Sequence, residues 1–202
     1  MKKPLVKFHK FWVLQARVMA MIILFTGAAL AAEKQSVDVN GGFEEGPSNS
    51  LTKWAIFGPF QKNLMVSEEK FHGGSRSLRI PINAEIEGKI AGAQQMLDAN
   101  LFKPGDVVGV SAYVFLTSSA CKPGVALEVF GPDGKDIAVA SCRIEDLEGE
   151  WQLVKSSLTI PENFNQSCTV KLIAKVFSKA APAGNDDAYI DDIQVSIEQK
   201  AK

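Results

Sequence analysis

Histidine and cysteine are scarce in this sequence, and their scarcity excludes several kinds of site. Of the 202 residues only two are His and three are Cys. His9 lies in the basic N-terminal region, which leaves His72 for the rest of the chain, and no two cysteines form a CxxC pair. A zinc site needs several such ligands at close spacing, so we expect none. A Ser-His-Asp triad or Cys-His pair would have to use His72, which lies in a Gly-Gly turn of structural character.

Other catalytic groups are also poorly represented. Tyr113 and Tyr189 are the only tyrosines, and the sequence lacks the motifs that place a Tyr or His base beside an Arg in a polysaccharide lyase. Composition leaves a two-carboxylate glycosidase open, because 23 Asp and Glu are available. Nothing in the spacing sets two of these acids opposite each other. We therefore expect a protein that is not an enzyme.

The first 31 residues have the composition of a signal peptide. Five basic residues and no acidic residue precede or begin an uncharged run, Val18–Leu30, that closes on Ala29-Leu30-Ala31. Small residues at these positions suit a signal peptidase. A helix of this length spans roughly 20 Å, less than the ~30 Å hydrocarbon core. We expect a cleaved signal peptide over residues 1–31; the alternative is a retained anchor, lengthened by Phe11–Leu14.

The exported part is acidic. Removal of residues 1–31 takes away five of the 22 Lys and Arg and none of the 23 Asp and Glu, which leaves a formal charge of −6. An acidic surplus without a basic stripe argues against nucleic acid and anionic membrane surfaces as partners. We expect a secreted or periplasmic, extracytoplasmic protein with no stable membrane insertion after cleavage.

Beyond residue 36 the sequence shows a period-two alternation of apolar and polar residues and no convincing helical periodicity. Such runs predict strands with one buried face. Turn signals separate them, and Pro132-Asp133-Gly134 is the clearest hairpin loop. We therefore predict one all-β domain over residues 32–197, a two-sheet antiparallel jelly-roll β-sandwich, with a frayed tail at 198–202. The alternating runs are Leu78–Ile82, Val108–Leu116, Val125–Val129, Val170–Val176 and Tyr189–Ile197.

The order of local motifs resembles the galactose-binding-like jelly-roll carbohydrate-binding modules, the group that includes carbohydrate-binding module families four, nine and twenty-two. The resemblance runs from about residue 37 to 197. It implies one sheet from segments near 77–82, 107–116, 151–160 and 188–197. It implies a second, concave sheet from segments near 89–96, 125–130, 136–143 and 169–177. The matching pieces are Asn40–Glu44, Trp54, Phe71–Ile80, Lys103–Asp106 with Ser111–Val114, Gly149–Val154 and Tyr189–Val195.

This implied arrangement also sorts the cysteines. The hairpin would set residue i opposite residue 266 − i, which places Cys142 opposite residue 124 and within a few residues of Cys121. Cys168 would lie at the far end of the second sheet. The resemblance therefore implies a Cys121–Cys142 disulfide and an unpaired Cys168, and closing this loop would be worth roughly 3 kcal/mol.

Asp191 is an acid where the alternation expects a core residue. The period-two pattern places it on the same face as Ile193, where an ionised carboxylate must be paired or metal-bound. The resembling families hold a structural calcium ion at this place. The resemblance implies Ca²⁺ ligands from Glu44, Asp191 and backbone carbonyls around His72 to Gly74, a donor set that a hard cation prefers. The alternative is that Asp191 only accepts backbone N–H bonds or lies at a wet strand edge.

Outward positions of the implied second sheet form the predicted ligand-binding surface. Aromatic rings flanked by long polar side chains suit a saccharide. A solvated sheet face with cross-strand Glu–Lys pairs would have the same pattern. The candidate ligand residues are Phe130, Phe177, Glu128, Lys171, Lys175 and a Gln at 94 or 95, of which we choose Gln94.

The sequence thus predicts a secreted, non-catalytic module whose partner is a carbohydrate, a polysaccharide or oligosaccharide bound on the concave sheet. The rival hypothesis is a cell-envelope β-sandwich with a structural or protein-binding role and no sugar ligand. We place Trp54 and Trp151 in the core rather than in a sugar site.

Overall fold

The computed structural model describes residues 34–58, 64–82, 89–117, 121–144, 148–178 and 186–200. This part of the chain is built almost entirely from β-strands, with one turn of 3-10 helix at Ala99–Leu101. The predicted signal peptide lies outside the described residues. The strands are β1 (Lys34–Val37), β2 (Ala55–Phe57), β3 (Met65–Ser67), β4 (Ser77–Ile82), β5 (Ile90–Leu97), β6 (Val107–Leu116), β7 (Cys121–Phe130), β8 (Asp136–Arg143), β9 (Gln152–Thr159), β10 (Thr169–Ser178) and β11 (Asp186–Glu198).

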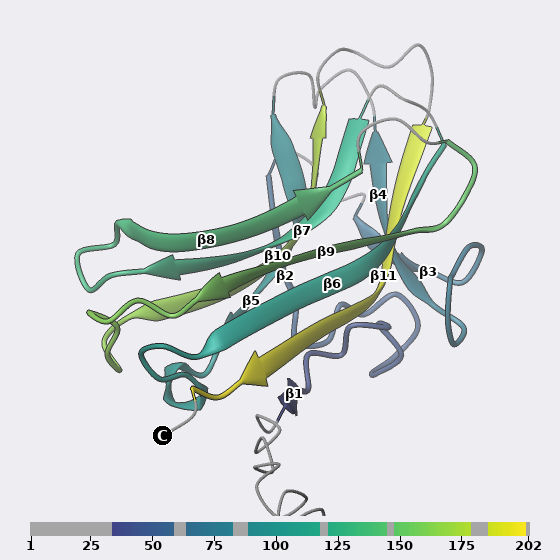
Figure 1. Ribbon diagram of the computed structural model, residues 1–202. Helices are drawn as coiled ribbons and strands as arrows, with labels where there is room; N and C mark the ends of the chain where they lie inside the picture. Colours follow the sequence, from purple (N-terminus) through teal and green to yellow (C-terminus); the bar gives the residue numbers. More distant parts are fainter. Residues whose placement is uncertain are drawn as a thin grey trace, which may run out of the picture. The chain divides into compact units, whose positions relative to one another are not determined.

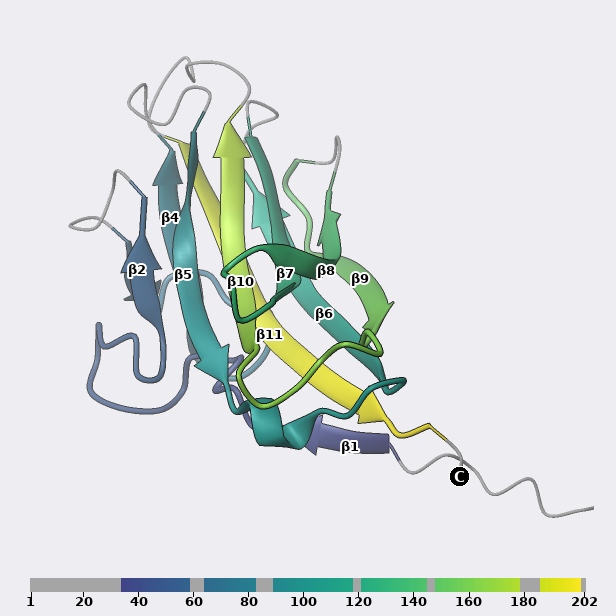
Figure 2. The same ribbon diagram turned by 90° about the vertical axis from the view of Figure 1, so that its left-hand side faces the viewer.

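Two antiparallel sheets face each other, as Figures 1 and 2 show. The first sheet has the order β3-β4-β11-β6-β9, with β1 paired to β11, and the second has the order β2-β5-β10-β7-β8. Both sheets contain the segments expected from the sequence, so the predicted all-β jelly-roll sandwich is confirmed. No helix in the described ranges has the length and hydropathy required to cross a membrane.

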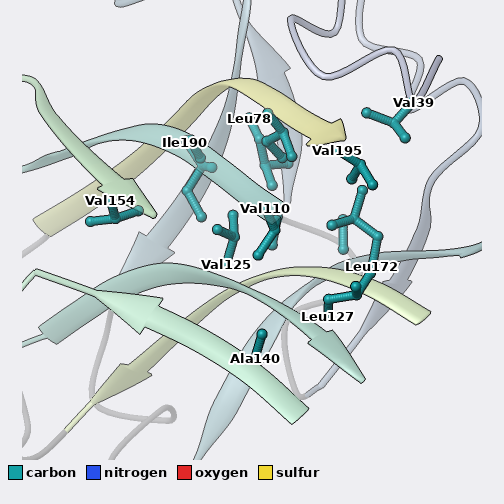
Figure 3. Packing of buried hydrophobic residues seen from close by; sticks show 14 of the residues in the cluster. Val39, Leu78, Val110, Val125, Leu127, Ala140, Val154, Leu172, Ile190 and Val195 are labelled. Atoms are coloured by element: carbon teal, nitrogen blue, oxygen red, sulfur yellow. The ribbon is translucent and has the colours of Figure 1, made fainter. Parts of the chain in front are cut away.

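Alternating apolar residues build the core between the sheets (Figure 3). Val125, Leu127 and Leu172 from the second sheet are fully buried against Leu78 and Val110 of the first. The period-two patterns of β6, β7 and β10 therefore point their apolar faces inward as predicted. Burial of each such side chain contributes about 1.5–3 kcal/mol, which makes this layer the main source of stability.

A β-bulge in β11 overturns the predicted facing of its first half. The pairing of β11 with β6 shifts between Asp191 and Gln194, and Asp192 has a positive φ of 48°. A bulge changes which residues face inward. Ile190 and Ile193 both point to the core, while Tyr189 pairs with Phe115 and Asp191 with Tyr113 on the outer face of the sheet. The prediction that Tyr189 and Asp191 share the core face is wrong.

The predicted disulfide is absent, and a second register shift, in β8, moves Cys142 one residue farther from Cys121. The expected pairing holds at Phe130 and Asp136, but an extra residue at Ile137 moves every later pair by one position. Cys142 therefore lies opposite Val125, four residues or about 13 Å along β7 from Cys121. A disulfide requires Cα atoms within about 7 Å. No bond joins Cys121 to Cys142, and Cys168 forms none, at the other end of β10 as expected.

Candidate functional site

The six candidate ligand residues all lie on the outer face of the second sheet. Phe130, Glu128 and Lys171 follow one another across β7 and β10, because Lys171 pairs with Glu128 and Thr169 with Phe130. Gln94 on β5 pairs with the outward Ile173, whereas Gln95 is buried and donates a hydrogen bond to the carbonyl oxygen of Val39 at 2.8 Å. The choice of Gln94 over Gln95 therefore agrees with the register.

Polar contacts on this face include a cross-strand ion pair. Lys175 Nζ lies 3.2 Å from Glu128 Oε1, and both side chains are about one-fifth exposed. Lys171 Nζ lies 4.4 Å from the centre of the Phe130 ring, a cation–π contact. The Glu–Lys pair is the feature expected of a solvated sheet face, and the aromatic ring beside a long polar side chain is the feature expected of a saccharide surface. Both are present.

Phe130 and Phe177 lie at opposite ends of the sheet. Phe130 pairs with Thr169 at the start of β10, whereas Phe177 is eight residues farther along that strand. At about 3.4 Å per residue their backbones are roughly 27 Å apart. One sugar ring cannot contact both phenylalanines, so a joint role would require an extended chain.

The Phe177 end contains a hollow of about 300 Å³ that the sequence did not predict. We call it the cationic hollow, after three of its lining side chains. Lys175 and Phe177 line it as predicted ligand residues. Lys122 and Gly124 were not predicted, because Pro123-Gly124 suggested that β7 begins at Val125, whereas it begins at Cys121. The residues that line it include Ile90, Lys122, Gly124, Arg143, Lys175 and Phe177.

Gly124 keeps the floor of the cationic hollow open. It lies between Lys175 on β10 and Arg143 on β8, in one row across three strands. A Cβ at this position would collide with the backbone carbonyl oxygen of Cys142. The close approach of β7 and β8 therefore requires glycine, and it leaves the two flanking cations separated by a gap without a side chain.

A second depression, on the outer face of the first sheet, has a volume of about 590 Å³ and is open to solvent. Its lining includes Lys155, Ser111 and Ser196, and none of the described residues that line it is aromatic. The hollow beside Phe177 is the stronger candidate for a sugar, because an aromatic ring borders it.

Glu44, Asp191 and the turn at His72 to Gly74 meet, as the resemblance implied. Asp191 is fully buried and accepts hydrogen bonds from the backbone N–H groups of His72 at 2.7 Å and Gly73 at 3.1 Å. Glu44 Oε1 accepts from the N–H groups of Ser75 at 2.7 Å and Arg76 at 2.9 Å. These bonds join the 72–76 turn to the opening segment and to β11. The turn therefore secures β11 between its pairings with β4 and with β1.

The pKa values of the Asp191 and Glu44 carboxyl groups are shifted in opposite directions, although burial raises both. It raises the pKa of Asp191 to about 6, although N–H groups of Gly73, His72 and Asp192 act in the other direction. Burial also raises the pKa of Glu44, but hydrogen bonds from Ser75 and Arg76 outweigh it and hold that pKa below its ordinary value. The backbone donors therefore do not fully offset the desolvation of Asp191.

The fit of this cluster to calcium is partial. Glu44, Asp191 and Asp192 converge around Gly42, and carboxylate oxygens suit a hard cation. The turn at 72–76, however, presents N–H groups to the carboxylates, and among the residues described no group of three or more His, Cys, Asp or Glu has the geometry of a metal site. Calcium at Glu44, Asp191 and the His72–Gly74 carbonyls remains a prediction.

Trp54 is buried in the core as expected, but Trp151 is not. Trp151 lies on the outer face of the first sheet, its ring centre 5.6 Å from that of Phe115 and 5.8 Å from that of His72. His72 stacks on Tyr113 at 3.4 Å between ring centres, and its Nδ1 lies 2.7 Å from Asp192 Oδ2. His72 therefore packs in an aromatic cluster and holds the bulge of β11.

No protein-family model matches this sequence, and no curated protein sequence matches it. Solved structures do match its fold. The CBM22-1 xylan-binding domain of Paenibacillus barcinonensis Xyn10C is 19% identical, with 86% of this chain and 100% of that chain covered and a TM-score of 0.55. TmCBM61, solved with β-1,4-galactotriose, is 19% identical over 80% of this chain and 97% of that chain, with a TM-score of 0.52.

A cyclase from Fischerella sp. TAU also matches, at 15% identity over 84% of this chain and 100% of that chain, with a TM-score of 0.63. Identities this low establish the fold and not the activity. This chain has the jelly-roll fold of the carbohydrate-binding modules, as its motifs implied, and the same fold also occurs in an enzyme.

Proposed function

We propose that this chain is an exported, non-catalytic carbohydrate-binding module that holds an oligosaccharide or polysaccharide on the outer face of its second sheet. The cationic hollow carries the proposal, because an aromatic ring, Phe177, borders a concave surface with polar side chains. Such a convergence is typical of small-ligand sites. The proposal is also supported by the fold, which a xylan-binding domain and a module solved with β-1,4-galactotriose share.

Affinity electrophoresis through gels that contain xylan, β-1,4-galactan or acidic polysaccharides tests the proposal. At least one polymer should retard the folded protein, and Phe177→Ala should weaken that binding about tenfold, since loss of an aromatic contact and its buried area costs roughly 1–2 kcal/mol. Leu153→Ala, on the exposed surface of the first sheet, is the matched control and should bind normally. Failure of every polymer to retard the folded protein would instead favour an envelope protein without a sugar ligand.

Phe130 contributes in this proposal only to long ligands, because it lies at the far end of the face from Phe177. Phe130→Ala should weaken the binding of a polymer and leave the affinity for a trisaccharide unchanged. Calorimetry with the two ligands measures the difference. Equal losses for both would show that the saccharide does not run along the strands.

The non-catalytic part of the proposal has a separate test, since a cyclase shares the fold. Incubation with the bound polysaccharide should release no new reducing ends and no unsaturated products. His72 contacts Asp192 and stacks on Tyr113. It packs against the first sheet, whereas the proposed ligand surface is on the second. Turnover that His72→Gln abolishes would overturn this part.

Export is likewise a proposal, based on residues 1–31 of the sequence. Expression of the full chain in a secreting bacterium should yield a protein in the periplasm or medium that begins at Ala32. Intact-mass measurement identifies the first residue. A full-length mass in the membrane fraction would establish the retained anchor instead.

A further inference from the structure

The centre of the outer face of the second sheet is buried, although its side chains point away from the core. Val125 and Leu127 face inward on β7, so Ala126 between them faces outward. Ala126 pairs with Ile173 on β10, which lies on the same face. Ala126 is 0% exposed and Ile173 only 6%. Other side chains on the outer face therefore cover this pair.

The ion pair between Lys175 and Glu128 crosses above these two residues. Glu128 lies two residues from Ala126 along β7. Lys175 lies two residues from Ile173 along β10, in the opposite direction, because the strands are antiparallel. Their backbones are thus about 14 Å apart along the strands, yet Lys175 Nζ is 3.2 Å from Glu128 Oε1. The two side chains can meet only by extending toward each other across the Ala126–Ile173 row. We call this ion pair the strap.

The row beneath the strap continues onto the neighbouring strands with polar side chains. Ser141 on β8 pairs with Ala126. Gln94 on β5 pairs with Ile173. An apolar floor with a hydroxyl at one end and an amide at the other suits the C–H face and the hydroxyl groups of a sugar ring. Ser141 also lines the cationic hollow, so the covered row is continuous with it.

The strap also lies between the two aromatic ends of this face. Phe177 lies beyond Lys175 on β10, and Phe130 lies beyond Glu128 on β7. A saccharide chain that extends along the strands from Phe177 to Phe130 must therefore pass over the row that the strap covers. While the strap is closed, its two side chains occupy that path.

We propose that the strap closes a central saccharide subsite on the Ala126–Ile173 row and that a long saccharide chain opens it, whereas a short ligand in the cationic hollow leaves it closed. This inference rests on the proposed function and deepens it, because it states how the site distinguishes ligand length. Both side chains of the strap are about one-fifth exposed, and an ion pair in contact with water contributes little to stability. A long ligand can therefore offset the cost of opening, but its affinity is lowered by that cost.

Titration calorimetry of the chain that begins at Ala32 tests the strap with trisaccharides and hexasaccharides of xylan, β-1,4-galactan and polygalacturonate. Lys175→Met combined with Glu128→Gln removes both charges and keeps the side chains close to their original size. The ratio of hexasaccharide to trisaccharide affinity should rise about threefold to fivefold, since opening no longer breaks an ion pair. The ratio is the proper measure because Lys175 also lines the cationic hollow, so its loss can change the affinity for both lengths.

Two control variants separate the strap from other roles of these residues. Lys175→Glu combined with Glu128→Lys restores an ion pair with the charges exchanged, and its affinity ratio should equal that of the wild type. Lys155→Gln removes a lysine from the outer face of the first sheet and should leave the ratio unchanged. If the strap residues instead bound the long ligand directly, both double variants would lower the ratio, and the inference would be overturned. A ratio that rose equally in both double variants would also overturn it, because ion pairing would then not close the subsite.

The outcomes separate this inference from the proposed function. Binding of both lengths, with a ratio that the neutral double variant does not raise, would overturn the inference and leave a carbohydrate-binding module. Failure of the folded protein to bind any of these oligosaccharides or their polymers would remove both. A ratio that rises in the neutral double variant and returns to the wild-type value in the charge-exchanged variant supports both.

Discussion

Gly74 lies where the 72–76 turn contacts Glu44 of the opening segment. Its φ of +64° is a conformation that costs an alanine about 1–2 kcal/mol, and a Cβ there would collide with Glu44 Oε1. Gly74→Ala should therefore lower the free energy of unfolding by about 2–4 kcal/mol, measured by urea denaturation.

Gly134→Ala is the matched control for this prediction. Gly134 has a similar φ of +76° in the β7–β8 hairpin, but nothing lies within 4 Å of the position its Cβ would take. The free energy of unfolding of Gly134→Ala should fall only by the cost of the backbone conformation, about 1–2 kcal/mol. Equal losses in the two variants would mean that Glu44 does not hold the turn.

Arg79 links β4 to the start of β11 through a bidentate contact with Asp187. Arg79 Nε and Nη2 each donate to an Asp187 oxygen at 2.9 Å, and both side chains are less than one-third exposed. Charge-assisted bonds of this geometry contribute more than a surface ion pair. Arg79→Gln should lower the free energy of unfolding by about 1–2 kcal/mol. Asp187→Asn combined with it should add little further loss, because the two residues share one interaction; full additivity would contradict the pairing.

At the scale of the element, the pairing of β7 with β8 predicts the state of the cysteines. Because Cys142 lies opposite Val125, the protein denatured without reductant should react with three equivalents of a thiol reagent. In the native protein Cys142 should react slowly at pH 8, since burial raises the pKa of its thiol. Reaction with only one equivalent after denaturation would instead indicate the disulfide that was expected from the sequence.

Bulges mark the limit of what alternation can predict in this chain. The strands β6, β7 and β10 follow period two without interruption, and their inward faces could be predicted residue by residue. The extra residue at Ile137 and the shift after Asp191 have no signature in apolar periodicity, because a bulge depends on local backbone angles and partner strands. Each reverses the facing of its strand. The core placement of Asp191 failed for this reason. The disulfide failed because even the expected partner of Cys142, residue 124, is three residues or about 10 Å from Cys121, and the bulge adds one residue more.

The candidate ligand face could be predicted only where strand limits were correct. Phe130, Glu128, Lys171 and Lys175 lie where alternation put them. Lys122 was missed because Pro and Gly normally end or weaken a strand, whereas β7 passes through Pro123-Gly124. Arg143 lies in a segment that was predicted, but it pairs with Gly124 only because of the register shift in β8. Motif resemblance, which depends on the order of turns, was sufficient for the sheets and insufficient for the lining of the hollow.

Calcium at the join of the opening segment, the 72–74 turn and β11 is also an element-scale prediction. The converging carboxylates and the raised pKa of Asp191 indicate that a cation there would relieve charge repulsion and desolvation. EDTA should therefore lower the Tm of the wild-type protein by several degrees at pH 7.5. Asp191→Asn should have a Tm that EDTA does not change. An unchanged wild-type Tm, with and without added calcium, would leave backbone N–H groups as the only partners of Asp191.

At the scale of the whole molecule, the proposed function assigns binding to the second sheet and leaves the first sheet to stability. In the first sheet β11 is the strand through which β1, β4, β6 and the opening turn are connected. The six candidate residues and the cationic hollow are found on the outer face of the second sheet. Substitutions on that face should therefore change binding with little effect on unfolding, whereas substitutions around β11 should do the opposite.

β1 completes the first sheet by pairing with the last residues of β11. It joins Lys34–Val37 to Val195–Glu198, and Val37 packs against the core. A chain that begins at Asp38 would leave the end of β11 as an edge and expose Val195 and Ile197 on one side. Relative to a chain that begins at Ala32, its free energy of unfolding should fall by about 1–3 kcal/mol in urea denaturation, from lost backbone bonds and burial. Lys34→Ser with Gln35→Ser keeps the backbone pairs and should behave as the longer chain does; if that variant were as unstable as the shortened chain, side chains rather than strand pairing would secure this edge.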